Sequence, residues 1–132
     1  MKLAMFRVNT AVGPQSRLGV VTLDNGTNNT IEDARSEAGY IVDVNFALAA
    51  KMATEGHGNP SVRADAFCPP DLQAFVMIHE CNPDLLEEII EWSNEHADES
   101  GTNGEYIRWR LSDITLLPPI SRVPVLRDFA AF

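Results

Sequence analysis

The sequence lacks any apolar run approaching 18 residues, and this absence excludes a transmembrane helix. Its first seven residues are interrupted by Arg7 and contain no long apolar stretch, so we expect no secretory signal. Its two cysteines, Cys68 and Cys81, are too few for a disulfide framework. These absences together predict a cytoplasmic protein in a reducing compartment.

Lysine and arginine are absent from residues 80–105, although that window holds nine acidic residues. Acids and bases cancel over the rest of the chain, so the whole formal net charge of −9 lies in this window. Proteins that bind nucleic acid or an anionic membrane surface need a basic surface instead. The charge distribution therefore argues against both kinds of partner.

What the chain does contain is enough apolar sequence for one folded domain. It has 132 residues, of which 45% are hydrophobic and 22% charged, as is usual for a soluble globular domain. Short apolar runs and extended patterns predict strands at residues 3–8, 17–23, 40–44, 105–111 and 113–117. With the helices described next, they predict an α+β fold, a small, partly barrel-like antiparallel β-sheet with two to three helices.

The predicted helices lie in the middle of the chain. Asn45 is placed to cap an alanine-rich helix over residues 46–54. Residues 69–71, Pro-Pro-Asp, are expected to precede a short second helix. The side chains of that helix expected to face inward are Leu72, Phe75 and Val76.

The third helix has the clearest signals. Asn82 is expected to cap it and Pro83 to occupy its first turn. Its apolar residues recur at helical spacing and predict a buried face made of Leu85, Leu86, Ile89, Ile90 and Trp92.

Four glutamates on the same helix precede His96 and offer a first candidate site; they are Glu87, Glu88, Glu91 and Glu95. Paired carboxylates near a histidine suit metal binding or acid–base chemistry. The same spacing arises whenever a helix turns its polar side to water, at a repulsion of roughly a few tenths of a kcal/mol per pair. We favour the solvated helix face.

Soft metal ligands offer a second candidate in His79, Cys81 and Cys68. The two cysteines are thirteen residues apart, and no CxxC or HxxxH pattern supports zinc. We therefore favour a buried thiol beside a helix. His57 lies in a glycine-rich loop and could act as a base, but the sequence pairs it with no nucleophile or orienting acid.

Over residues 1–132 the chain resembles the N-terminal region of the fumarylacetoacetate hydrolase family. The stretches that carry the resemblance are Met1-Lys2-Leu3-Ala4 with Arg17-Leu18-Gly19-Val20-Val21, Ile41-Val42-Asp43-Val44-Asn45, Pro69-Pro70-Asp71-Leu72, and residues 111–120 followed by Arg127-Asp128-Phe129. Their order and spacing and the last stretch are the specific part. The resemblance implies an N-terminal fumarylacetoacetase-like domain at residues 1–117 and a proline-rich linker at residues 118–132 that begins the catalytic domain.

The resemblance also implies metal chemistry. From the residues alone, Asp128 could equally be a loop acid paired with Arg127. In the resemblance it corresponds to a metal-ligand aspartate of the family, whose members bind Mg²⁺, Mn²⁺ or Ca²⁺ and act on β-diketo or 2-oxo acids by C–C hydrolysis, decarboxylation or isomerisation. A hard cation chelates the keto-acid oxygens and stabilises the developing enolate. Ala130 stands where the family often has tyrosine near the substrate, so that contact is in doubt.

The remaining family residues fall beyond Phe132. The catalytic histidine and a Glu-x-Glu metal motif would follow it, and one carboxylate cannot hold a cation that takes about six oxygen ligands. We therefore expect a truncated fragment that has no catalytic residue of its own and is inactive alone. Its expected partners are the C-terminal catalytic domain of the same chain, a small keto-acid and, at full length, a second copy in a homodimer. The alternative is a free-standing, non-enzymatic interaction module that uses the acidic helix at residues 83–96.

Overall fold

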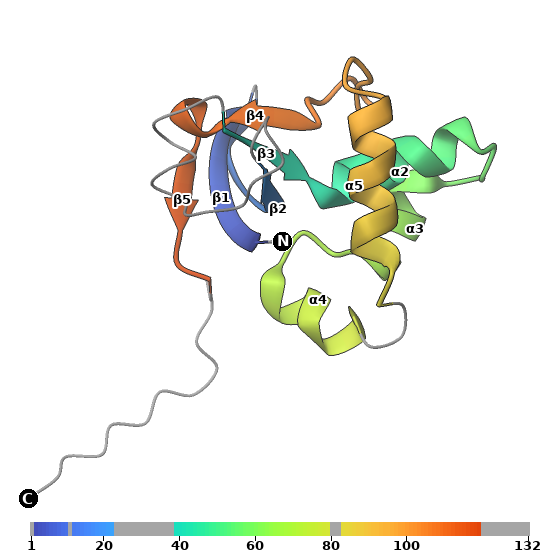
Figure 1. Cartoon of the computed structure of the whole chain (residues 1–132), viewed down its shortest axis with the longest axis horizontal. Helices are drawn as coiled ribbons and strands as arrows, with labels where there is room; N and C mark the ends of the chain where they lie inside the picture. Colours follow the sequence, from blue (N-terminus) through green and yellow to red (C-terminus); the bar gives the residue numbers. More distant parts are fainter. Residues whose placement is uncertain (1, 11, 23–38, 80–82, 120–132) are drawn as a thin grey trace, which may run out of the picture.

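The computed structural model of the chain describes residues 2–10, 12–22, 39–79 and 83–119. One antiparallel sheet carries helices that gather on one side of it (Figure 1). The strands are β1 (Lys2–Thr10), β2 (Gly13–Thr22), β3 (Tyr40–Asp43), β4 (Arg108–Arg110) and β5 (Thr115–Leu117). The helices are α2 (Val44–Thr54), α3 (Pro60–Phe67), α4 (Leu72–His79) and α5 (Leu85–Glu95).

The sheet has the order β4-β3-β2-β1-β5, and every neighbouring pair is antiparallel. Its longest pairing is the β1–β2 hairpin, in register from Lys2 opposite Val21 to Thr10 opposite Gly13. Gly13 has a φ of +108°, which a residue with a Cβ rarely adopts. The hydroxyl of Thr10 donates a 2.6 Å hydrogen bond to the carbonyl of Gly13 and closes the turn.

The predicted α+β class with an antiparallel sheet is confirmed, and the sheet predicted to be partly barrel-like is open. β4 and β5 form opposite edges of the sheet. Each of them pairs over three residues with its inner neighbour, and within the described ranges the two do not pair with each other. The sheet is therefore open.

The described residues form four helices, whereas two to three were predicted. The additional one, α3, follows a glycine-rich loop and begins at Pro60, a favourable first residue because it needs no hydrogen-bond partner. Ala64 is its one fully buried residue. The apolar periodicity that reveals a helix in a sequence is therefore missing from it.

Two hydrophobic clusters cover the two faces of the sheet, as the alternation of side chains along a strand requires. Neighbours Met5 and Phe6 of β1 separate into different clusters. The larger cluster packs the sheet against the helices and is made of Met5, Leu18, Val20, Val42, Val44, Ala47, Leu48, Ala49, Ala50, Ala64, Cys68, Phe75, Leu85, Leu86, Ile89, Trp92 and Ile107. The smaller one is made of Phe6, Val8, Val21, Ile41 and Leu111.

The predicted helix faces are mostly confirmed. The predicted apolar face of α5 is buried, except that Ile90 is half-buried, and Asp84 rather than Asn82 is its N-cap residue. Asn82 lies outside the described residues. In α4, Phe75 is buried and Leu72 half-buried, but the inward position predicted for Val76 is wrong because this side chain is 59% exposed.

The C-terminal extended patterns form shorter strands than predicted. From residues 105–111, the strand β4 takes up three, and Leu111–Asp113 folds as a 3₁₀ turn. From residues 113–117, β5 likewise takes up three. None of the helices in the described ranges is long and apolar enough to cross a bilayer.

Candidate functional site

A buried ion pair joins strand β2 to the end of strand β3, where helix α2 begins. The Nε of Arg17 donates to one carboxylate oxygen of Asp43 at 2.7 Å, and Nη2 donates to the other at 3.1 Å. Asp43 is fully buried and Arg17 is 8% exposed. The two charges are aligned because Gly19, in the same strand as Arg17, pairs with Asp43 across the β2–β3 ladder.

The same carboxylate begins helix α2. Its Oδ1 accepts a 2.9 Å hydrogen bond from the backbone N–H of Phe46, so Asp43 is the N-cap residue. The prediction that Asn45 caps this helix is therefore wrong. Burial raises the pKa of the Asp43 carboxyl, and the hydrogen bonds and charge of Arg17 oppose that rise. Both oxygens of Asp43 accept hydrogen bonds, as expected for the ionised carboxylate.

Asn45 instead connects the ion pair to helix α3. Its Oδ1 accepts from Nη2 of Arg17 at 3.0 Å. Its amide nitrogen donates to Asp65 and to the carbonyl of Cys68, both at 2.9 Å. Both amide hydrogens are donated and the oxygen accepts from Arg17, so only one orientation of the amide satisfies these partners. Hydrogen bonds thus link the side chains of four residues into a series, which we call the polar chain and which runs from the core to the surface: Asp43, Arg17, Asn45 and Asp65.

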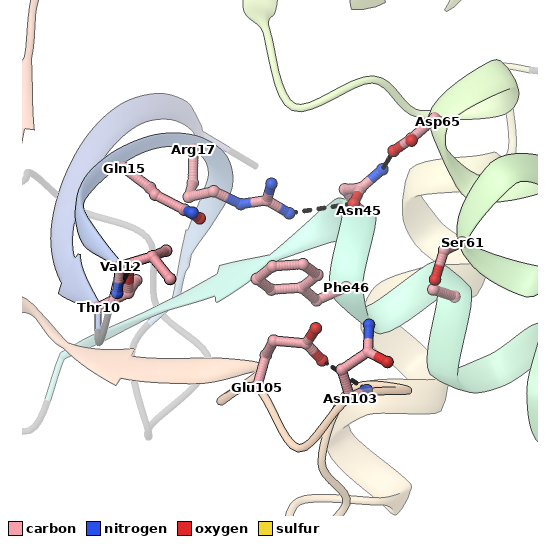
Figure 2. A pocket seen from close by; sticks show the side chains of 11 residues that line it. Thr10, Val12, Gln15, Arg17, Asn45, Phe46, Ser61, Asp65, Asn103 and Glu105 are labelled. Carbon is pink, nitrogen blue, oxygen red and sulfur yellow. Dashed lines mark hydrogen bonds between the residues drawn. The ribbon is translucent and has the colours of Figure 1, made fainter.

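A cavity of about 560 Å³ opens where this polar chain reaches the surface (Figure 2). Its walls come from the β1–β2 turn, from helices α2 and α3, and from the loop before β4. The lining residues are Thr10, Val12, Gln15, Arg17, Asn45, Phe46, Ala49, Ser61, Asp65, Asn103 and Glu105. The volume lies within the roughly 300–1,000 Å³ typical of small-ligand sites.

Phe46 projects into the middle of this cavity (Figure 2). The guanidinium carbon of Arg17 lies 3.7 Å from the centre of its ring, a close cation–π contact. Below the ring in that view lies Glu105, whose carboxylate accepts the backbone N–H of Asn103 at 2.9 Å. Within the described residues, neither Glu105 nor Asp65 forms an ion pair with a cation, so the cavity is negatively charged.

Cys68 ends helix α3 beneath the same network. Its side chain is fully buried. Desolvation, with a smaller contribution from the charge of Asp43, raises the pKa of the thiol from its ordinary 9.0 to about 12. The predicted buried thiol is confirmed for Cys68, whereas Cys81 lies outside the described residues.

The Cys68 thiol makes stability depend on alkaline pH. Its folded pKa lies above its unfolded one, so its full contribution to stability is present below about pH 9 and is lost as pH rises towards 12. The loss amounts to roughly 1 kcal/mol for each pH unit. Urea unfolding between pH 8 and 10.5 should therefore show a steeper fall in unfolding free energy for the wild type than for Cys68→Ala. Parallel pH curves for the two proteins would contradict the assignment.

The residue on which the sequence prediction placed metal binding, Asp128, lies outside the described residues. So do Cys81 and the rest of residues 120–132. Within the ranges that the structure describes, no three His, Cys, Asp or Glu side chains are grouped so as to hold a metal ion. The described residues thus do not by themselves supply the ligand set that the family resemblance implies.

The glutamates of α5 lie as predicted on an exposed face; they are Glu87, Glu88, Glu91 and Glu95. His96 is not directed to them. Its ring stacks on Trp92, with 4.5 Å between ring centres, and its Nδ1 lies 2.9 Å from the Trp92 carbonyl at the helix end. His57 is exposed, and its Nε2 lies 3.4 Å from the neighbouring Glu55. Neither histidine therefore lies in a cluster with the glutamates of α5.

Sequence inspection missed the polar chain and the cavity, although two signals for them exist. Arg17 begins the apolar run of β2, and Asp43 ends the apolar run of β3. A charged residue at a predicted strand–helix junction is a candidate for a cap and for burial with an opposite charge. The cavity had no such signal, because its walls come from segments far apart in the sequence.

Comparisons of the chain with protein-family models, curated proteins and solved structures found no match in any of the three. The resemblance to the fumarylacetoacetate hydrolase family therefore rests on the residues quoted for it.

Proposed function

We propose that the chain is the N-terminal domain of a metal-dependent enzyme of the fumarylacetoacetate hydrolase family. The whole enzyme acts on a β-diketo or 2-oxo acid by C–C hydrolysis, decarboxylation or isomerisation. The domain provides packing surface and Asp128 to a catalytic domain that follows in the same chain. It works in the cytoplasm, in a homodimer, and is inactive alone.

The observation that carries the proposal is the meeting of two resembling stretches at one buried ion pair. Arg17 begins one stretch and Asp43 lies in the middle of the other, and the two side chains are joined by two hydrogen bonds. The pairing gives a structural reason for a charged residue in each of the two apolar stretches. The last resembling stretch contains edge strand β5, which is followed by exposed Pro118 and Pro119.

Asp128 is the one metal ligand that the proposal assigns to residues 1–132. Mg²⁺, Mn²⁺ and Ca²⁺ prefer carboxylate and other oxygen ligands. Asp128 supplies one of them, and the others come from the following domain. When bound, the cation supplies charge stabilisation for the enolate that forms on the substrate.

A second candidate function has one specific observation in its favour. The four glutamates on α5 form an exposed acidic face, and the window at residues 80–105 contains no base. Such a face suits a non-enzymatic module that docks onto a basic protein. This hypothesis requires no further domain and predicts no metal-dependent activity from any longer product of the gene.

The two candidates are separated by the coding DNA beyond the codon for Phe132 and by the activity of its product. We expect the frame to continue through a histidine and a Glu-x-Glu sequence. We expect the longer product, with Mg²⁺, to consume an acylpyruvate that chain 1–132 leaves unchanged. A stop codon directly after Phe132, or equal turnover by chain 1–132, would overturn the proposal, and the stop codon would favour the docking module.

A further inference from the structure

We propose that the cavity over Phe46 is a binding site for a guanidinium group. The Phe46 cavity, as we call it, comprises the eleven lining residues given above. Nothing in the proposed function uses it, and the inference stands independently of that function. It follows from the charge of the walls, from their hydrogen-bonding character and from the stacking that Phe46 already makes.

The charge of the walls selects a cation. Arg17 is the one basic residue among the lining residues, and its charge is compensated by the two hydrogen bonds to Asp43. Asp65 and Glu105 add two carboxylates, and no cation of the described residues pairs with either. Opposite charge on a ligand is the interaction that such walls favour.

The polar atoms of the walls select a ligand rich in donors. Among the described residues, each carboxylate accepts one hydrogen bond, Asp65 from Asn45 and Glu105 from the backbone of Asn103. A carboxylate has about four acceptor positions, so both keep capacity for a ligand. The side-chain carbonyls of Gln15 and Asn103 add further acceptors. A guanidinium carries five N–H donors and no acceptor, and its planar fork matches a carboxylate.

The aromatic ring in the cavity selects a flat cation. Phe46 is half-buried, so part of its ring is open to the cavity. The guanidinium of Arg17 already lies over this ring at 3.7 Å. In the view of Figure 2 the ring lies between Arg17 and Glu105, and all three residues line the same cavity, so a ligand in it faces both the ring and a carboxylate. Guanidinium groups stack on aromatic rings more readily than ammonium groups do.

The walls are held in place before a ligand arrives. The hydroxyls of Ser61 and Thr102 lie 3.0 Å apart and join α3 to the loop before β4. Within that loop, the N–H of Gly101 donates to the carbonyl of Glu105 at 2.8 Å. Arg17 and Asn45 are buried and fixed by their hydrogen bonds. A preformed site loses less conformational entropy on binding.

The guanidinium has two possible sources, a small molecule or an arginine side chain of another protein. Agmatine tests the first and a blocked Gly-Gly-Arg-Gly-Gly peptide the second, each titrated into ¹⁵N-labelled chain 1–132. We expect saturable shifts of the backbone amides of Phe46, Asp65, Asn103 and Glu105. If the peptide binds at least as tightly as agmatine, the arginine belongs to a partner protein. If agmatine alone binds, the ligand is a small molecule.

Conservative variants test which residues carry the binding. Asp65→Asn and Glu105→Gln keep the volume of each side chain and remove its charge. Each should weaken agmatine binding about two- to fivefold, the size expected for an ion pair open to solvent. Glu95→Gln on the exposed face of α5 is the matched control and should leave the affinity unchanged. Thermal unfolding of each variant verifies that it is folded.

Three results would overturn the inference. The first is an absence of saturable shifts at the cavity residues with both agmatine and the peptide. The second is unchanged affinity in the Asp65→Asn and Glu105→Gln variants. The third is equal binding of 4-aminobutylurea, which keeps the ammonium end of agmatine and replaces the guanidinium with a neutral urea, and which would show that the guanidinium charge is not recognised.

Discussion

Replacing Asp43 with alanine is expected to lower the free energy of unfolding by about 3–5 kcal/mol, the usual cost of removing one partner of a buried ion pair. The substitution leaves the guanidinium of Arg17 without its counter-charge in a site where it is 8% exposed. It also removes the hydrogen bond that caps helix α2 at the N–H of Phe46. Because domains of this size have a free energy of unfolding of about 5–15 kcal/mol, the expected loss is a large part of the total stability.

The chain offers a matched control at another helix start. Asp84 is the N-cap residue of α5, but its side chain makes no capping hydrogen bond and is exposed. Asp84→Ala should therefore change the unfolding free energy by less than about 0.5 kcal/mol. The comparison holds the residue type and the helix position constant and varies burial and pairing.

A double variant separates the ion pair from the cap. Arg17→Met with Asp43→Ser removes both charges and retains a capping hydroxyl. Since the cost of the single variant comes mainly from the charge left unpaired, the double variant should recover most of the lost stability. Urea unfolding at neutral pH measures the unaltered protein and the three variants. A loss below about 1 kcal/mol in Asp43→Ala, or a double variant no more stable than the single one, would contradict the role assigned to the pair.

The sequence predicts the parts of this fold that have a local signal. The apolar runs of β1, β2 and β3 and the alternating faces of α5 were found because burial on one side imposes a period on the residues. Helix α3 was missed because it buries little more than Ala64. The sequence could not show whether the partly barrel-like sheet is open, because the pairings of β4 with β3 and of β5 with β1 join distant segments, and no local pattern records them.

The candidate site, too, could be predicted only where the sequence has a local signal. A polar residue beside a strand end was recognised, but Asn45 was assigned the capping role that belongs to Asp43, two residues earlier. Both side chains are good caps and both are buried, but α2 begins at Val44, so Asn45 lies inside the helix and Asp43 occupies the capping position. The Phe46 cavity combines residues from 10 to 105 of the chain, so its charge and shape exist only in the folded structure.

Asp128 carries the central claim, because it is the one residue of this chain that the proposal places on the metal. In the longer product of the gene, Asp128→Ala should lower Mg²⁺-dependent turnover of an acylpyruvate by at least ~100-fold. Residues that only support a metal ligand cost about 10–100-fold when changed, and loss of a ligand should cost more. Glu91→Ala, on the exposed face of α5, is the control and should retain full activity.

The most direct measurement is the turnover of that longer product and its Asp128→Ala variant at saturating substrate, with Mn²⁺ binding followed by electron paramagnetic resonance. We predict metal-dependent turnover in the unaltered protein, and in the folded variant a loss of both activity and Mn²⁺ affinity. Full activity and unchanged Mn²⁺ affinity in the variant would contradict the placement of Asp128 on the metal, and an unaltered protein without metal-dependent turnover would contradict the proposed enzyme family.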